Sequence, residues 1–210
     1  MAMYVVFDGM DGSGKGTQIS LLRKRYGDTV VFTREPGGPP LAEELRGIVR
    51  DNPLAGESTP LFHFLGFWMA REETMDKIVM PTLRGGRHVF SDRGDSSTFA
   101  FQLFGEDQKS LEEDFFRLRS RVFLTPGRKS PDHYVIFDLP ATVARERALQ
   151  DAKRKANHFD VRNLEYYERV REGFHEFGRR YPAIFIDATR SPEEIHRDVL
   201  KYLPAAVKKG

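Results

Sequence analysis

Short apolar runs recur along the chain and alternate with longer segments whose apolar residues repeat every three or four positions. Short runs rich in Val, Ile, Phe and Tyr are typical of buried strands, whereas the longer period is that of an amphipathic helix. Residues 41–50 illustrate the helical pattern, with an apolar face made of Leu41, Leu45, Ile48 and Val49. The apolar runs predict five strands, at residues 4–8, 29–33, 88–91, 134–139 and 183–187.

Helical segments separate the predicted strands along the whole chain. Ser58 or Thr59 is expected to cap a long helix, and Ser191 followed by Glu194 has the pattern of a capping box that opens the last helix. This alternation predicts an α/β protein with a parallel sheet, doubly wound and covered on both faces, whose ligands bind beyond the carboxyl ends of the strands. The predicted helices are residues 15–26, 41–50, 59–83, 96–104, 111–123, 141–150, 160–180 and a final one after 191.

A glycine-rich loop follows the first predicted strand. Residues 9–15, GMDGSGK, fit the pattern G-x-x-x-x-G-K and lead directly into a helix. Such a loop turns its N–H groups toward a phosphate, the helix N-terminus adds partial positive charge, and Lys15 can reach the β- and γ-phosphates of ATP. The usual metal-binding hydroxyl is replaced by Gly16, so we expect Mg²⁺ to be held through water. The candidate ATP-binding residues here are Gly9, Gly12, Ser13, Gly14, Lys15, Gly16 and Thr17.

A second charged motif closes the third predicted strand. Asp92 could orient hydrated Mg²⁺ and Arg93 could bind a phosphate, although the two could also form a simple strand-end ion pair. Further arginines stand at or near the ends of predicted elements around the expected cleft, which suits phosphoryl transfer between two anionic nucleotides. The polar run 151–155, DAKRK, is either a solvated loop or a lid over ATP. The arginines are Arg34, Arg46, Arg71 and Arg93.

Composition narrows the function classes. The chain has 33 basic and 31 acidic residues among 210, so its net charge of +2 does not indicate a nucleic-acid-binding protein. It has no cysteine, which excludes disulfides, thiolate catalysis and zinc ribbons. No apolar run is long enough to span a membrane, and the N-terminus lacks the pattern of a signal peptide. We therefore expect a cytoplasmic protein made of one domain, residues 1–210.

These motifs together resemble the thymidylate kinase family of P-loop nucleoside monophosphate kinases. The resemblance extends over nearly the whole chain, with segments at residues 7–18, 33–46, 67–71, 81–93, 96–102, 131–140 and 187–196. It implies a three-layer P-loop kinase fold, a five-stranded parallel sheet flanked by helices with a small mobile lid at about 150–159. It also implies that ATP and Mg²⁺ are used to convert dTMP to dTDP for dTTP synthesis, and that the protein is a homodimer.

The resemblance also implies roles for individual residues. The acceptor dTMP would be bound by Asp11, Arg34, Glu35, Pro36, Arg46, Phe67, Arg71, Arg93, Ser97, Thr98 and Gln102. Within this set, Arg46, Arg71 and Arg93 would hold the phosphate, Phe67 would stack on thymine, Thr98 and Gln102 would read its polar edge, and Pro36 could follow a cis peptide. Thr189 and Arg190 would flank adenine. The catalytic candidates are Asp11, Lys15, Asp92, Arg93, Arg147 and Arg154, with Asp92 as the Mg²⁺ ligand through water.

Several positions depart from the family pattern and keep alternatives open. Gly94 stands where the family usually has an aromatic residue or histidine, which leaves room for dUMP, UMP or a modified pyrimidine as acceptor. Gly12 leaves the loop without its own arginine, so lid cations are expected to matter more. Gly16 allows a nucleotide-binding module without transferase activity. A nucleic-acid-binding ATPase would need a basic stripe that the chain lacks.

Overall fold

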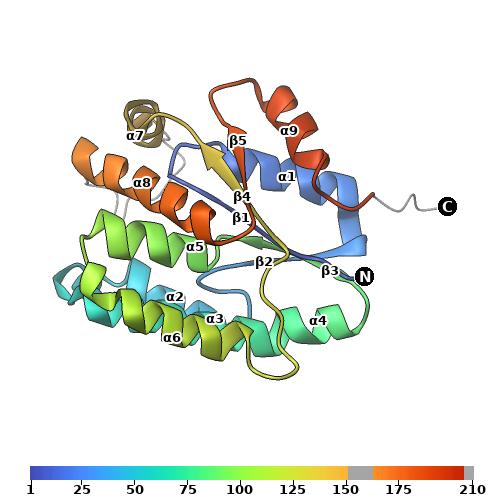
Figure 1. Ribbon diagram of the computed structural model, residues 1–210, viewed down its shortest axis with the longest axis horizontal. Helices are drawn as coiled ribbons and strands as arrows, with labels where there is room; N and C mark the ends of the chain where they lie inside the picture. Colours follow the sequence, from blue (N-terminus) through green and yellow to red (C-terminus); the bar gives the residue numbers. More distant parts are fainter. Residues whose placement is uncertain (151–162, 206–210) are drawn as a thin grey trace.

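A five-stranded parallel sheet forms the centre of the protein (Figure 1). The computed structural model describes residues 1–150 and 163–205. The order of the strands is β2-β3-β1-β4-β5, so the two strands that carry the candidate phosphate motifs, β1 and β3, are neighbours. The strands are β1 (Tyr4–Gly9), β2 (Val30–Arg34), β3 (His88–Asp92), β4 (His133–Asp138) and β5 (Ala183–Asp187).

Helices cover both faces of this sheet. In Figure 1, α1 and α9 lie on one side, and α3, α4 and α6 lie on the other. The helices are α1 (Lys15–Tyr26), α2 (Pro40–Arg46), α3 (Pro60–Thr74), α4 (Met80–Arg84), α5 (Asp95–Ser97), α6 (Glu112–Phe123), α7 (Ala141–Gln150), α8 (Leu164–Arg180) and α9 (Pro192–Leu200). Short 3-10 segments occur at η1 (Gly27–Thr29), η3 (Pro53–Glu57) and η6 (Lys109–Leu111), and π-helical segments at η2 (Gly47–Asp51), η4 (Met75–Val79) and η5 (Thr98–Gly105).

Local capping explains where several helices begin. The Thr59 side chain accepts from the N–H of Phe62 at 3.2 Å, so Thr59 rather than Ser58 caps α3. The capping box predicted at Ser191 is present in α9. Asn163 caps α8 by accepting from Tyr166 at 3.0 Å. That helix therefore begins at Leu164, and residues 151–162, which include the predicted lid apart from its first residue, lie outside the described part of the chain.

The core lies on both sides of β1 and β4, whose apolar residues are buried. Phe90 of β3 packs edge-on against Phe7 of β1. Among the helices, Phe99 of η5 packs edge-on against Phe115 of α6 and Phe177 of α8. All five predicted strands are confirmed, within two residues at each end. The predicted helix 59–83 is interrupted by the π segment η4. Across the described part of the chain, each helix is too short or too polar to span a bilayer.

Candidate active site

The predicted phosphate-binding loop connects β1 to α1 at the carboxyl edge of the sheet. Gly12 and Gly14 have left-handed φ angles of 80° and 77°, and no side chain caps the N-terminus of α1. The hydroxyl of Ser13 is buried and has no hydrogen-bond partner among the described residues. An uncapped helix N-terminus next to an unpaired buried hydroxyl is suited to bind an anionic oxygen.

Lys15 reaches across from α1 to the carboxyl end of β3. Its ammonium group forms an ion pair with Oδ1 of Asp92, and only 11% of the lysine side chain is exposed. Burial alone would raise the pKa of Asp92, but the charges of Lys15 and Arg93 lower it below its ordinary value. Oδ2 of Asp92 accepts no hydrogen bond within the described residues and remains available to a ligand. Gly16 and Thr17 are exposed, and a side chain at Gly16 would enter open space.

Arg93 is fixed by two carboxylates. It has a left-handed φ of 70° and directs its side chain back toward β1. Its Nη1 donates to Oδ1 of Asp8 at 3.1 Å and to Oγ of Ser97 at 3.0 Å, and its Nη2 donates to Oδ1 of Asp11 at 2.7 Å. Burial would lower the pKa of Arg93, but Asp11 and Asp8 raise it above its ordinary value. The guanidinium is therefore a permanent cation beside the phosphate-binding loop.

Asp8 was not among the residues predicted for the site. Its carboxylate is completely buried, although the surrounding residues of β1 are apolar. A charged residue inside an otherwise apolar strand is the sequence signal that could have identified it.

A second cluster surrounds Arg71 of α3. Nε of Arg71 donates to Oε2 of Glu35 at 2.6 Å, Nη2 donates to Oγ1 of Thr98 at 3.0 Å, and the guanidinium lies 4.3 Å from the centre of the Trp68 ring. Burial raises the pKa of Glu35 even though Arg71 opposes this shift. Nη1 of Arg71 is buried without a partner among the described residues, and so are both polar atoms of the Gln102 side-chain amide. Unpaired buried donors and acceptors of this kind are expected where a polar ligand binds.

The loop after β2 forms the rim of this cluster. The Glu35–Pro36 peptide is cis, which confirms the predicted possibility. Nη1 of Arg46 donates to the Pro36 carbonyl at 3.0 Å. Arg34 forms a two-pronged pair with Glu43 at 3.0 and 2.7 Å and is 52% exposed. Phe67 is half-buried on α3. The positive charge of Arg34 is therefore already neutralised by Glu43.

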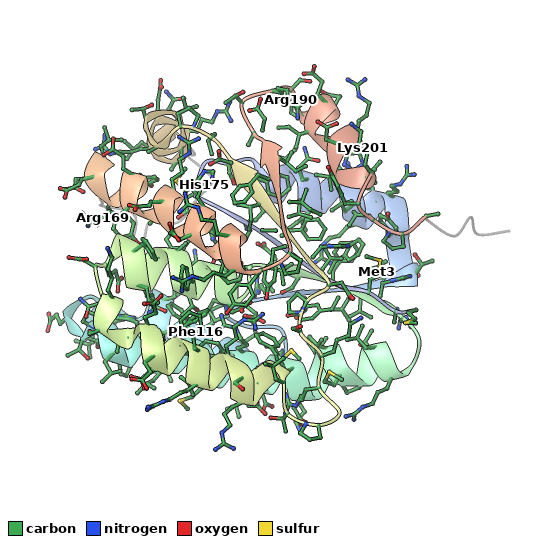
Figure 2. The ribbon with its side chains drawn as sticks, in the orientation of Figure 1. Met3, Phe116, Arg169, His175, Arg190 and Lys201 are labelled. Carbon is green, nitrogen blue, oxygen red and sulfur yellow. The ribbon has the colours of Figure 1, made fainter. Side chains whose placement is uncertain are left out.

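The residues predicted near adenine lie around the turn from β5 to α9. Both the N–H and the hydroxyl of Thr189 donate to Oδ1 of Asp187, at 2.9 and 2.6 Å. Arg190 pairs with Asp198, and Figure 2 shows Arg190 and Lys201 near the two ends of α9. Arg147 donates to the Ala188 carbonyl at 2.9 Å, so it faces this turn. Arg154 lies outside the described residues.

Two glycines that depart from the family pattern are explained by close packing. A Cβ on Gly12 would lie 2.2 Å from the carbonyl oxygen of Ala144, because the backbone of α7 lies against the loop. A Cβ on Gly94 would lie 2.9 Å from Cγ1 of Val6. Position 94 therefore faces the core beneath β1, so the missing side chain does not by itself open space beside an acceptor sugar.

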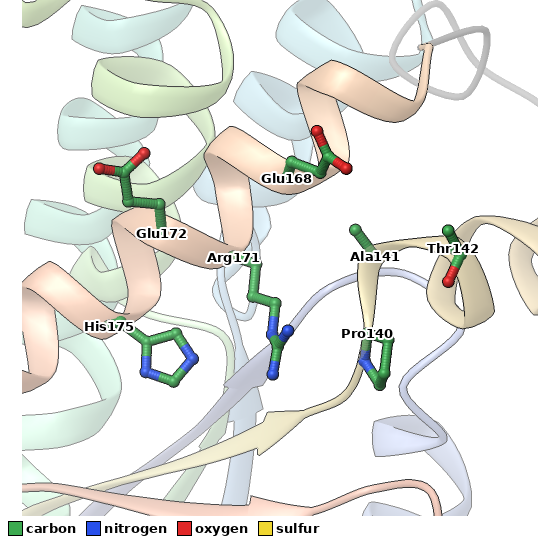
Figure 3. A pocket seen from close by; sticks show the side chains of 7 residues that line it. All are labelled: Pro140, Ala141, Thr142, Glu168, Arg171, Glu172 and His175. Carbon is green, nitrogen blue, oxygen red and sulfur yellow. The ribbon is translucent and has the colours of Figure 1, made fainter.

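A separate groove of about 490 Å³ lies between the start of α7 and α8 (Figure 3). It contains none of the predicted site residues. In Figure 3, Arg171 extends from α8 toward the end of β4, where it is paired with both oxygens of Asp138 at 2.8 Å. Within residues 1–150 and 163–205, no group of three or more acidic, histidine or cysteine side chains is arranged to hold a metal ion. We place neither nucleotide in this groove.

Comparison with known proteins gives one consistent result. The family model described as "Thymidylate kinase" matches residues 7–199. A thymidylate kinase of Pelotomaculum thermopropionicum is 36% identical over 205 residues, covering 94% of this chain and 91% of that protein. One from Chlorobaculum tepidum is 33% identical and covers 99% of both chains. The crystal structure of thymidylate kinase from Ehrlichia chaffeensis superposes with a TM-score of 0.72 at 30% identity, covering 95% of this chain and 97% of that one.

Proposed function

The chain belongs to the thymidylate kinase family, and we propose that the site described above transfers the γ-phosphate of ATP to dTMP, giving dTDP and ADP. Two clusters support this reading: a phosphate-binding loop for the donor, and the cluster around Arg71, whose buried polar atoms without partners among the described residues suit the acceptor. The observation that carries the choice of acceptor is the buried, unpaired set made of Arg71 Nη1 and the Gln102 amide.

We assign Arg71 to the base of dTMP rather than to its phosphate. Its charge is already balanced by Glu35 at 2.6 Å, and it lies buried beside Thr98 and Trp68. An N–H of Nη1 can donate to the O4 carbonyl of thymine or uracil, whereas the amino group of cytosine would meet it donor against donor. The amide of Gln102 can accept from N3–H and donate to a neighbouring carbonyl. An unmatched base would leave these groups unpaired, which is how a polar site rejects a wrong substrate.

We assign Arg93 to the acceptor phosphate. With Nη1 held by Asp8 and Ser97, and one N–H of Nη2 held by Asp11, its remaining donors are Nε–H and the second N–H of Nη2. These two donors can bind phosphate oxygens. Arg46 would approach the same phosphate from the rim, and Asp11 would lie beside it. Phe67 would stack on the base.

On the donor side, loop N–H groups, the Ser13 hydroxyl and Lys15 would bind the ATP phosphates, with Thr189, Arg190 and Arg147 near adenine. Lys15 must then exchange part of its contact with Asp92 for phosphate oxygens. The residues fit a hydrated Mg²⁺, because the Asp92 side chain is 34% exposed and its Oδ2 has no hydrogen-bond donor among the described residues. When bound with ATP, Mg²⁺ would neutralise phosphate charge. The rest of the catalysis is alignment of two nucleotides, with no covalent enzyme intermediate.

We also propose that the protein is a homodimer that packs through α3. One face of this helix exposes Leu61, Phe62, Leu65 and Met69, with exposed fractions of 47%, 42%, 46% and 59%. Contiguous apolar side chains of this size on a surface are typical of an interaction site. The absence of cysteine is compatible with the proposed cytoplasmic location.

The proposed reaction is tested by a coupled ADP-release assay with ATP, Mg²⁺ and six acceptors: dTMP, dUMP, UMP, CMP, AMP and GMP. We expect the highest kcat/KM with dTMP, lower activity with dUMP, whose base presents the same O4 and N3–H, and little with cytosine or purine nucleotides. A preference for UMP, CMP, AMP or GMP would overturn the substrate assignment. Binding of ATP without phosphorylation of any acceptor would overturn the proposed reaction itself.

A further inference from the structure

We propose that Asp8 is a positioning residue for the acceptor phosphate, which acts by fixing the guanidinium of Arg93. This inference rests on the proposed role of Arg93 in binding that phosphate. Asp8 stands one residue before the end of β1, and Arg93 stands one residue after the end of β3. The two strands are hydrogen-bonded neighbours in the sheet, so a contact between residues far apart in sequence is built into the rigid part of the fold.

The carboxylate of Asp8 is the acceptor in all four of its hydrogen bonds within the described residues. Oδ1 accepts from Nη1 of Arg93 at 3.1 Å, from Oγ of Ser97 at 2.7 Å and from the N–H of Gly9 at 2.9 Å, and Oδ2 accepts from Oγ of Ser96 at 2.6 Å. The Asp8 side chain is completely buried. A buried carboxylate with four donors has a fixed position and holds its partners in turn.

The arrangement restricts Arg93 to one orientation. Nη1 contacts three acceptors, since Ser97 Oγ at 3.0 Å and the Gly9 carbonyl at 3.1 Å accept from it in addition to Asp8. Because Nη2 also donates to Asp11, this leaves Nε–H and the second N–H of Nη2 for a ligand. The ring of Phe101 lies 5.0 Å from the guanidinium carbon and limits movement from one side. Arg93 also has the left-handed φ of 70° that non-glycine residues seldom adopt, which indicates that its surroundings determine its conformation.

Ser97 has a corresponding part in this cluster. Its hydroxyl donates to Asp8 and accepts from Arg93, so its proton is already used. We therefore assign Ser97 to the support of Arg93 rather than to direct contact with dTMP. Ser96 provides a matched comparison, because its hydroxyl also donates to Asp8 but forms no hydrogen bond with Arg93 in the described part of the chain.

The test uses Asp8→Asn, a substitution of the same shape. The amide oxygen can replace Oδ1, and the amide nitrogen can donate to Ser96, so the main loss is the charge that holds Arg93. We expect kcat/KM for dTMP to fall at least about tenfold, the loss expected for one charged hydrogen bond. The KM for ATP should stay unchanged. Ser97→Ala should lower kcat/KM for dTMP in the same direction, while Ser96→Ala should leave it unchanged.

The same substitution in an Arg93→Ala background separates positioning from a general structural role. If Asp8 acts through Arg93, Asp8→Asn should add no further loss there. An equal loss in both backgrounds, or no loss in either, would overturn the inference. Affinity for dTMP, measured by calorimetry, gives the same comparison for variants too slow to assay.

Asp95→Asn controls for the burial of a carboxylate. Asp95 is also completely buried and accepts from Arg119 and Tyr134 at 2.8 Å, yet it does not contact Arg93. The Asp95→Asn substitution should lower thermal stability without changing the KM for dTMP. If wild-type protein phosphorylates another monophosphate instead of dTMP, the proposed acceptor is wrong, and the cycle with that acceptor still decides the role of Asp8.

Discussion

Replacing Gln102 by leucine should change stability and activity in opposite directions. Gln102 is 1% exposed, and neither polar atom of its amide has a partner among the described residues. A buried polar group without a partner costs about 1–3 kcal/mol of folding free energy, and leucine has a similar volume without that cost. The nucleotide-free Gln102→Leu protein should therefore gain about 1–3 kcal/mol in free energy of unfolding.

The acceptor site should lose a comparable amount. If the amide forms two neutral hydrogen bonds with thymine, each worth about 0.5–1.5 kcal/mol, the loss is about 1–3 kcal/mol. This corresponds to a rise of about 5- to 150-fold in the KM for dTMP. Urea denaturation without nucleotide measures the gain in stability, and the coupled ADP-release assay measures the loss.

Gln18→Leu is the matched control. Gln18 is equally buried, but its amide donates to the Pro192 carbonyl at 2.9 Å, and its oxygen lies 3.1 Å from Nδ1 of His196. Leucine there should lower the free energy of unfolding by about 1–3 kcal/mol. If Gln102→Leu loses stability, or if its KM for dTMP is unchanged, the conclusion that the Gln102 amide binds the acceptor is refuted.

Three further predictions concern the loop, the Lys15–Asp92 pair and the surface of α3. Gly12→Ala should destabilise the protein by about 1–3 kcal/mol and displace α7, because its Cβ would lie 2.2 Å from the carbonyl oxygen of Ala144. Gly14 has a similar φ of 77°, but a Cβ there would meet no described atom within 4 Å, so Gly14→Ala should lower the melting temperature less. An equal fall in melting temperature for the two variants would contradict the packing argument. Because the folded-state pKa of Asp92 is lowered, its contribution to stability is present above its ordinary pKa of about 4 and is lost as the pH falls through the lower folded value. Urea denaturation from pH 7 to pH 2 should show wild type losing stability relative to Asp92→Asn in that acidic range, and parallel curves would exclude the effect. Leu65→Glu should convert the proposed dimer to a monomer in sedimentation velocity. Leu124→Glu should not, because Leu124 is exposed at the C-terminal end of α6 rather than on α3. A monomeric wild-type protein would contradict the proposed interface.

The sequence was sufficient for features in which neighbouring residues carry the information. The strand, loop and helix from β1 to α1 could be predicted because the apolar run, the glycines and Lys15 follow one another directly in the sequence. The cap at Ser191 could be predicted because its partner Glu194 is three residues away. The start of α8 was predicted too early, since Asn163 rather than an apolar period determines it.

The contacts between distant segments could not be predicted in the same way. The pairing of Arg71 with Glu35 joins residues 36 positions apart, and that of Arg93 with Asp8 joins residues 85 apart. From sequence, Arg71 and Arg93 were equivalent candidates for the phosphate, whereas their acidic partners now give them different assignments. Gly94 likewise kept other pyrimidine acceptors open in the sequence analysis, and only the position of Val6 explains why a glycine stands there.

The most direct test of the central claim compares dUMP with dCMP as acceptors for the wild-type protein. The two nucleotides have the same sugar and phosphate and differ in whether the base presents a carbonyl and N3–H or an amino group and an unprotonated N3. Because Arg71 Nη1 can only donate, the proposed site predicts that kcat/KM is at least about tenfold higher with dUMP, the effect of one mismatched polar contact. Equal or faster phosphorylation of dCMP would contradict the account.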